Sequence, residues 1–492
     1  MKNSDIKNKA VRGVTWNLIE RFGIQIIRLI LGIVLARLLS PEEFGVMGVV
    51  MVFVLVAQVF IDSGFGQAYV QKNNVTDEDA NTVFFTNLGV SILLLIALWF
   101  LAPWISEFYE SPMLASYLRV MGFVMIINAF NVIQVAKLTR AINFKNKSVI
   151  TLVSVLLAGV MGVIAAWKGL GVWSLIIQHL SERLFITLGL WFKSKWRPTY
   201  VFSKASFKEM FRFGAWILFA GVITKLFENI YVLVIGKLFP MGTLGYYSQS
   251  KKFQRISTQQ ITGAVGVVTF PIFAQAQSNL PVLQNRIKKF LQHTLVFIVP
   301  LLTTFAIVAE PFVMILLTDK WAPMIPYLRL LCIAGLLYPI NVVNVKVLLA
   351  IGKSRLNFIL TLFKNILRII NIIITAKYGV IWIIVGEITI SFISVFINTF
   401  FVQKHVKYGI WGQIKDTWKF YVSAMVAASF GYILIRFIEN QWLLLVLGIV
   451  TVFGVYLLMQ LLFNKDILLE SFKLQNTLFM SMNKKSKKKN VE

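Results

Sequence analysis

Apolar residues fill most of the chain in long runs, and short polar segments interrupt these runs at regular intervals. Most runs hold about 20 to 25 residues, enough for a helix to cross a hydrocarbon layer of roughly 30 Å. A strand of a membrane barrel needs only about 9 to 11 residues, so the pattern predicts transmembrane helices. The runs give fourteen predicted spans: 13–38, 44–68, 82–103, 114–137, 148–167, 169–192, 210–238, 244–274, 290–309, 324–349, 356–376, 380–402, 418–438 and 442–463.

The chain repeats its own plan once. Residues of the first half recur in the same order about 200 to 210 positions later. The matched positions are Trp16 and Trp216, Arg37 and Lys237, Leu38 and Leu238, Gly45 and Gly245, Tyr117-Leu118-Arg119 and Tyr327-Leu328-Arg329, Asn131 and Asn341, and Leu138 and Leu348. Duplicated bundles of this kind are typical of transporters, which hold their substrate where the repeats face each other.

The repeat determines the fold class that we expect. It is an all-α membrane protein with fourteen transmembrane helices, in which two six-helix bundles are related by a pseudo-two-fold axis along the membrane normal. Two further helices follow the second bundle. The expected domains are an N-terminal six-helix bundle (1–205), a C-terminal six-helix bundle (206–405), two additional transmembrane helices (406–463) and a basic cytoplasmic tail (464–492).

Composition supports a membrane protein and excludes other classes. Hydrophobic residues make up 58% of the chain, charged residues 14%, and the mean hydropathy is +0.75, too apolar for a water-soluble core. With the N-terminus in the cytoplasm, about 30 Lys and Arg fall on inside segments and about 6 on outside segments, the bias of a correctly oriented bundle. Both termini are then cytoplasmic, and the net charge of +28 reflects membrane orientation and not nucleic-acid binding.

Motifs for enzyme or cofactor chemistry are missing from the sequence. There is no glycine-rich phosphate loop, HExxH or GxSxG motif, so the chain is not expected to hydrolyse ATP or to act as a hydrolase. The single cysteine, Cys332, excludes an intramolecular disulfide, and no cluster of Cys and His suggests a metal site. We therefore expect a membrane transporter and not an enzyme, without catalytic residues, metal or cofactor.

A second population of charges lies inside the predicted spans, where each uncompensated charge costs roughly 2.5 to 3.5 kcal/mol on insertion scales. Most are basic, and they fall with Asn and Gln at helical spacing on the first, seventh, eighth and eleventh spans. Ion pairs with acids such as Glu20 or Glu228, and snorkelling side chains, are one interpretation. Because acids are few, a basic cavity for an anionic partner is favoured. Its expected substrate-binding residues are Arg21, Gln25, Arg28, Lys225, Lys252, Arg255, Gln259, Lys364 and Arg368.

Two carboxylates are candidates for coupling transport to an ion gradient. Asp62 lies late in the second span, and Glu387 lies in the outer part of the twelfth. A carboxylate inside the membrane can exchange a proton, which is how ion-driven carriers sense a gradient. A purely structural role for either residue is equally open. For Glu182, which lies beside Arg183 in the sixth span, we expect a structural role.

Several motifs resemble the polysaccharide-exporter branch of the multidrug/oligosaccharidyl-lipid/polysaccharide (MOP) flippase superfamily. The likeness spans about residues 10 to 460 and is specific in order and spacing, although no single motif is catalytic. The motifs are LARLLSPEEFG at 35–45, Asp62-Ser63-Gly64-Phe65-Gly66, Gln71-Lys72, Gly245-Tyr246-Tyr247-Ser248, Phe270-Pro271, Tyr338-Pro339-Ile340-Asn341 and Ala350-Ile351-Gly352-Lys353-Ser354.

This resemblance implies a Wzx-type flippase of the bacterial cytoplasmic (inner) membrane. Two bundles in a V shape would turn an undecaprenyl-pyrophosphate-linked oligosaccharide to the outer leaflet by alternating access. The partners would be this lipid-linked oligosaccharide, membrane lipids, a polysaccharide polymerase and a chain-length regulator, with no nucleic acid. A pyrophosphate suits a basic cavity, because arginine can hold phosphate oxygens in a bidentate way. The preferred contacts are Arg21, Arg28, Lys252 and Arg255.

Three other functions compete with this interpretation. A cation-coupled multidrug exporter of the same superfamily should recognise cationic or neutral amphiphiles, for which a positively charged lumen is unsuitable. A sugar or anion carrier of the major facilitator type is also built from six plus six spans, but its Gly-Asp-Arg signature is absent from 70–81. A membrane polymerase or glycosyltransferase usually has a sizeable outside loop, and the sequence predicts none.

Overall fold

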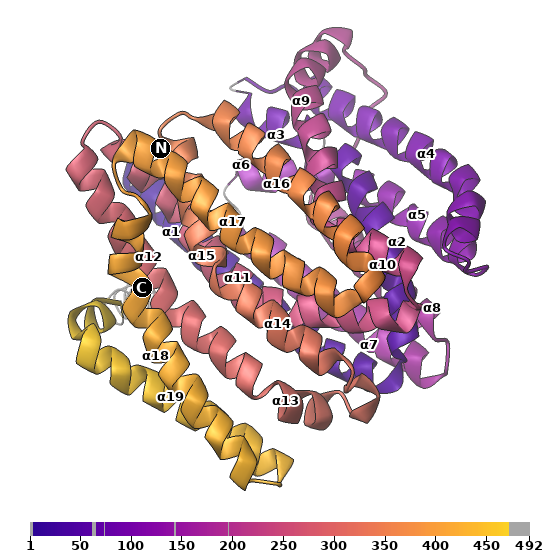
Figure 1. The fold of residues 1–492 in the computed structure, drawn as a ribbon. Coiled ribbons are helices and arrows are strands. Elements are labelled where there is room, and N and C mark those ends of the chain that lie inside the picture. Colours follow the sequence, from indigo (N-terminus) through magenta and orange to yellow (C-terminus); the bar gives the residue numbers. More distant parts are fainter. Residues whose placement is uncertain (1–2, 62–64, 73, 142–143, 195, 472–492) are drawn as a thin grey trace, which may run out of the picture. The chain divides into compact units, whose positions relative to one another are not determined.

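Helices are the only regular secondary structure in the part of the chain that the structure describes (Figure 1). This computed structural model describes residues 3–61, 65–72, 74–141, 144–194 and 196–471. Long apolar segments become helices in a membrane because each backbone N–H and C=O must find its partner within its own segment. The helices form two compact units, Met1–Gly245 (unit 1) and Tyr246–Glu492 (unit 2).

In unit 1, some packed helices are consecutive in the sequence, and others are far apart in the sequence. The pairs α4 and α5, and α7 and α8, pack along each other, and α1 packs against α7. The helices are α1 (Asn3–Leu38), α2 (Pro41–Ile61), α3 (Phe65–Gln71), α4 (Asp77–Phe108), α5 (Leu114–Ala129), α6 (Val132–Arg140), α7 (Phe144–Trp167), α8 (Val172–Lys193), α9 (Lys204–Glu228), α10 (Ile230–Leu238) and the first residues of α11 (Met241–Ala276).

Unit 2 holds the rest of α11 and the helices that follow it. Here α12 packs against α14, α18 and α19, and α17 packs against α14, α15 and α16. The helices are α12 (Leu280–Ile307), α13 (Ala309–Leu316), α14 (Met324–Leu336), α15 (Tyr338–Ala350), α16 (Ser354–Thr375), α17 (Val380–Val406), α18 (Ile410–Phe437) and α19 (Gln441–Phe463), with short 3₁₀ turns at Asp319–Trp321 and Ala376–Tyr378.

The helices of both units form a multi-pass membrane protein. Each predicted span coincides with a helix or with two consecutive helices. Among the described residues, ten helices are long and apolar enough to cross a membrane, or eleven if α9 and α10, bent by 44°, form one span. The three other predicted spans coincide with α1, α8 and α11, which carry the charges discussed below. The count of fourteen spans therefore stays a prediction.

The start of α2 shows why the motif at 35–45 has its sequence. Ser40 and Glu43 form a capping box: the Glu43 N–H donates to Ser40 Oγ at 3.3 Å, and the Ser40 N–H donates to Glu43 Oε2 at 2.6 Å. Pro41 occupies the first helical position, where its missing N–H and fixed φ are tolerated. The motif therefore stops one helix and begins the next within two residues.

Gly45 lies one turn into α2, where this helix crosses the first turn of α11 inside unit 1. A Cβ atom on Gly45 would lie 1.9 Å from the carbonyl oxygen of Met241, and one on Gly245 would lie 1.9 Å from that of Pro41. These two glycines are matched positions of the sequence repeat. Only residues without a side chain allow the two backbones to approach this closely.

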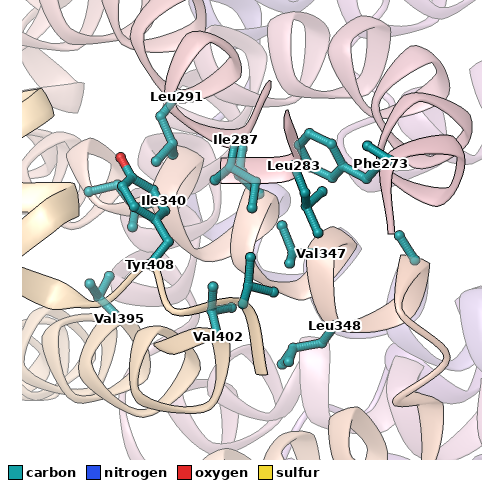
Figure 2. Packing of buried hydrophobic residues seen from close by; sticks show 14 of the residues in the cluster. Phe273, Leu283, Ile287, Leu291, Ile340, Val347, Leu348, Val395, Val402 and Tyr408 are labelled. Carbon is teal, nitrogen blue, oxygen red and sulfur yellow. The ribbon is translucent and has the colours of Figure 1, made fainter. Parts of the chain in front are cut away.

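One part of the unit 2 core joins α11, α12, α15 and α17 (Figure 2). Fully buried aliphatic side chains from α12 meet those of α15 and α17, and Tyr408 from the loop before α18 closes one side. The residues labelled in Figure 2 are Phe273, Leu283, Ile287, Leu291, Ile340, Val347, Leu348, Val395, Val402 and Tyr408. This packing anchors the end of α11 around Phe273 in the same core as α17.

The border between the compact units falls at Gly245 and not near 205. Its cause is that α9 packs against α2, α3 and α4, and α10 packs against α2. Compactness and internal repetition are different criteria, so the four domains proposed from the sequence remain a prediction.

Candidate functional site

Charged and amide side chains gather within unit 2, on α11, α16 and α17. Lys364 and Arg368 are four residues apart on α16 and therefore project from one face. Asn365 and Asn371 are buried beside them, toward α17, which packs along α16 (Figure 1). The opposite face of α16 is apolar and exposed, as expected of a surface that meets lipid: Leu362, Ile366, Ile369, Ile370 and Ile373.

Glu387 of α17 forms an ion pair with Lys251 of α11. The side chains of Lys251 and Glu387 are only 19% and 18% exposed. The hydroxyl of Tyr247, one turn before Lys251, donates to Glu387 Oε2 at 3.4 Å. Removing one partner of a fully buried pair typically costs about 3 to 5 kcal/mol, since the other charge is left without compensation, and the cost is lower for a partly buried pair such as this one.

Two arginines act on this ion pair. Arg255 follows Lys251 by one turn on α11, and Arg368 approaches from α16. Both lie close enough to repel Lys251 and to attract Glu387 electrostatically. In the described part of the chain, no carboxylate forms an ion pair with either arginine.

Neutral amides hold the basic groups of α16. Lys364 Nζ donates to Asn398 Oδ1 at 3.2 Å, and the Asn398 amide donates in turn to Asn341 Oδ1 at 3.0 Å. Arg368 Nη1 donates to Asn365 Oδ1 at 2.9 Å. An amide oxygen orients a cation without neutralising it. We define the basic cluster as Lys251, Arg255 and Arg368 around Glu387, together with Lys364, which lies beside Arg368 on α16. The cluster has four cations and a single carboxylate.

A second amide network fixes the helices behind the basic cluster. The Asn344 amide donates to Thr399 Oγ1 at 2.9 Å and to Gln413 Oε1 at 3.1 Å, and the Gln413 amide returns a bond to Asn344 Oδ1 at 2.9 Å. All three side chains are buried. Because satisfied buried networks rigidify a core, these bonds fix α15, α17 and α18 relative to one another.

Two of the basic residues expected in unit 1, Arg28 and Lys225, are neutralised. Arg28 Nη2 lies 2.6 Å from Glu182 Oε1, and Lys225 Nζ lies 2.7 Å from Glu228 Oε2. Glu182 is buried, in line with the structural role expected for it. The sequence analysis favoured Arg28 and Lys225 as cations without a carboxylate partner. In the structure each of them forms an ion pair with a glutamate. Surplus positive charge is therefore found in unit 2 and not at these two places.

The remaining expected site residues divide into two groups. Gln25 and Lys252 are described and each makes interactions, Gln25 half-buried on α1 and Lys252 exposed on α11. Asp62 and the side chains of Arg21 and Gln259 lie outside the described residues. No group of three or more His, Cys, Asp or Glu side chains in the described ranges could hold a metal ion.

Sequence reasoning missed two members of the site, Lys251 and Tyr247. It placed the polar stripe of this helix at Lys252, whereas the ion pair is made by the preceding residue. The spacing of Tyr247, Lys251 and Arg255, each four residues after the last, was the available signal for a shared face. The basic cluster can therefore bind an anion that carries more negative charge than one carboxylate.

Comparison with known proteins identifies the family of the chain. The model of a family described as polysaccharide biosynthesis protein matches residues 34–326. The chain is 25% identical over 404 residues to the lipopolysaccharide biosynthesis protein WzxC of Escherichia coli (strain K12), covering 82% of each chain. It is 27% identical over 329 residues to the succinoglycan biosynthesis transport protein ExoT of Rhizobium meliloti (strain 1021), covering 67% of each.

A solved structure shares the fold. The inward closed conformation of the lipid II flippase MurJ superposes with a TM-score of 0.74 at 18% sequence identity, and the match covers 92% of this chain and 100% of that one. At this identity the likeness concerns the arrangement of the helices, and the residues of the site must be judged on their own geometry.

Proposed function

The chain belongs to the polysaccharide biosynthesis protein family and is a membrane transporter, and from this premise we propose that it is a lipid-linked oligosaccharide flippase. The cargo is an undecaprenyl-pyrophosphate-linked oligosaccharide repeat unit, which alternating access moves from the cytoplasmic to the outer leaflet of the bacterial cytoplasmic membrane. The product supplies surface polysaccharide assembly. Fourteen spans, two six-helix bundles and cytoplasmic termini are part of this proposal.

One observation supports the proposal above the others: the basic cluster has four cations and one carboxylate. A pyrophosphate brings the missing negative charge, and hydrogen bonds between charged groups are roughly twice as strong as neutral ones. Arg255 and Arg368 are the strongest candidates for phosphate contacts, because no carboxylate in the described chain pairs with them. Lys364, which Asn398 holds through its amide oxygen, adds a third.

The other expected residues have weaker support. Arg28 and Lys225 are paired with acids, so they would have to exchange partners to bind phosphate. Lys252 and Gln25 are proposed as polar contacts of the sugar path, and Arg21 and Gln259 are proposed from the sequence pattern alone. Asp62 and Glu387 are proposed as groups that couple flipping to an ion gradient.

A cation-coupled multidrug exporter is the alternative function. Family relatives named for polysaccharide biosynthesis argue against it, and so does the charge of the basic cluster, which would repel a cationic drug. A strain lacking the gene separates the two functions. Unchanged drug sensitivity together with loss of surface polysaccharide supports the flippase, and the reverse result supports the exporter.

The direct test of the proposed function uses purified protein in vesicles that contain a fluorescent undecaprenyl-pyrophosphate-linked oligosaccharide. We expect headgroups to become accessible to a membrane-impermeant reagent faster than in vesicles without protein, because a hydrated path replaces passage through the hydrocarbon core. Vesicles that hold the same amount of heat-unfolded protein are the control. Equal rates with folded and unfolded protein would rule out flipping of this lipid.

A further inference from the structure

The partly buried ion pair between Lys251 and Glu387 has a role that the proposed function does not assign. We infer that Glu387 is an internal anion that holds the place of the substrate phosphate on Lys251. The inference rests on the proposed function and states which group must leave when the anionic headgroup binds. Lys251 then becomes a phosphate-binding residue, although the sequence analysis chose its neighbour Lys252.

The position of Lys251 supports this role. Tyr247, Lys251 and Arg255 follow one another at intervals of four residues, so the lysine lies on the same face of α11 as an arginine without a carboxylate partner. It is the member of the cluster that contacts Glu387, and its side chain is 19% exposed. A cation this far from water needs an anion at all times, whether or not substrate is bound.

Like-charge repulsion at Lys251, and not the total charge of the cluster, favours an exchange of anions on this lysine over simultaneous binding to it. One carboxylate brings a single negative charge to four basic groups, whereas a pyrophosphate diester brings two. A headgroup that joined the cluster with Glu387 still in place would meet like-charge repulsion from the carboxylate. If the headgroup replaces Glu387 on Lys251, neither the empty nor the loaded state leaves the lysine unpaired.

The contacts of Glu387 allow it to leave. Besides Lys251, its carboxylate accepts one hydrogen bond, from Tyr247 at 3.4 Å, beyond the usual range for O–H donors. A carboxylate that stabilises a helix end is also held by a backbone N–H donor. Asp79 of unit 1 accepts from Lys72 Nζ at 3.0 Å and from the Thr76 N–H at 2.9 Å in a capping box. Glu387 has no backbone donor of this kind in the described chain and can turn away without breaking a helix end.

The test measures binding of undecaprenyl pyrophosphate to the full chain in nanodiscs. If Glu387 competes with phosphate, Glu387→Gln removes the competitor and should bind about tenfold more tightly than wild type. Lys251→Gln should bind about tenfold more weakly. In the double variant Lys251→Gln/Glu387→Gln, most of the gain in affinity caused by Glu387→Gln should disappear, because the lysine for which the glutamate and the phosphate compete is absent.

Matched controls separate competition from a structural role. Glu310→Gln removes the carboxylate of an exposed ion pair with Arg329 in the same unit, and it should leave affinity unchanged. Uncharged undecaprenol should bind all variants equally. If Glu387→Gln does not fold, Glu387→Asp keeps the charge on a shorter side chain and should give a smaller gain in affinity.

Three outcomes decide the inference. Tighter binding of the pyrophosphate by Glu387→Gln or Glu387→Asp, with undecaprenol unaffected, supports it. Equal or weaker binding by folded Glu387 variants, while wild type binds and flips, overturns the inference and leaves the proposed function standing. Wild-type protein that binds undecaprenyl pyrophosphate no better than undecaprenol overturns both.

Discussion

Replacing Arg255 and Arg368 together with glutamine is expected to slow flipping of the lipid-linked oligosaccharide by about 100-fold or more, since each charge-assisted contact contributes about 1.5 to 3 kcal/mol. Neither arginine forms an ion pair in the described chain, so the change leaves no carboxylate stranded. Glutamine keeps hydrogen-bonding capacity and most of the volume while removing the charge. Initial flipping rates in vesicles, with protein amounts matched, are the measurement.

A substitution of another arginine in unit 2 is the control for the general effect of losing a positive charge. Arg329 of α14 pairs with Glu310 at 3.2 Å, and the side chains of Arg329 and Glu310 are 41% and 46% exposed. Exposed pairs contribute about 0 to 1 kcal/mol, so Arg329→Gln should change flipping by no more than about a few-fold. Equal losses in Arg329→Gln and in the double variant would mean that unit 2 responds to any loss of positive charge and that the basic cluster has no special role.

Replacing Gly45 with alanine is expected to destabilise the protein by more than about 3 kcal/mol, at the upper end of overpacking costs. The added methyl group would lie 1.9 Å from a backbone oxygen, that of Met241, and a backbone cannot rotate away as a side chain can. Helices α2 and α11 would have to separate at their crossing. Gly245→Ala should have the same effect, because its Cβ would meet the Pro41 carbonyl oxygen at the same distance.

Gly89 supplies the matched control. It also lies in a helix, α4, but a Cβ atom there would have nothing within 4 Å. Alanine at this position should be neutral or should stabilise the helix by about 0.5 to 1 kcal/mol. The thermal transition and the yield of monodisperse protein measure both changes. A Gly45→Ala variant as stable as Gly89→Ala would show that the crossing is looser than the structure indicates.

The helical architecture could be predicted from sequence because hydrophobic length alone determines a transmembrane helix. The predicted span 356–376 became α16, and 380–402 became the main part of α17. The breaks inside spans were not predicted. Two spans that the repeat matches to each other are each divided into two helices. The division lies near Phe130, between α5 and α6, and near Leu337, between α14 and α15. No proline kink or polar interruption is common to the two positions.

The candidate site could be predicted only in part, because tertiary packing decides which charges meet. Arg28 and Glu182 are 154 positions apart, so nothing in the local pattern of α1 indicated that the arginine would be neutralised. On α11, Lys251 and Lys252 are adjacent, but successive residues of a helix point about 100° apart. Choosing between them required the position of Glu387 on α17. Lys364 and Arg368 of α16 stay predicted binding residues, and their spacing of four residues, which places both on one helix face, was visible in the sequence.

The central claim is that the basic cluster of unit 2 receives the pyrophosphate of a lipid-linked oligosaccharide. A cryo-electron microscopy map of the full chain in nanodiscs with this lipid tests it most directly. The account predicts density for the two phosphates within about 3 Å of the guanidinium groups of Arg255 and Arg368, the distance of a charge-assisted hydrogen bond. Side chains of these two arginines that face acyl chains, or pyrophosphate density bound elsewhere in the protein, would contradict it.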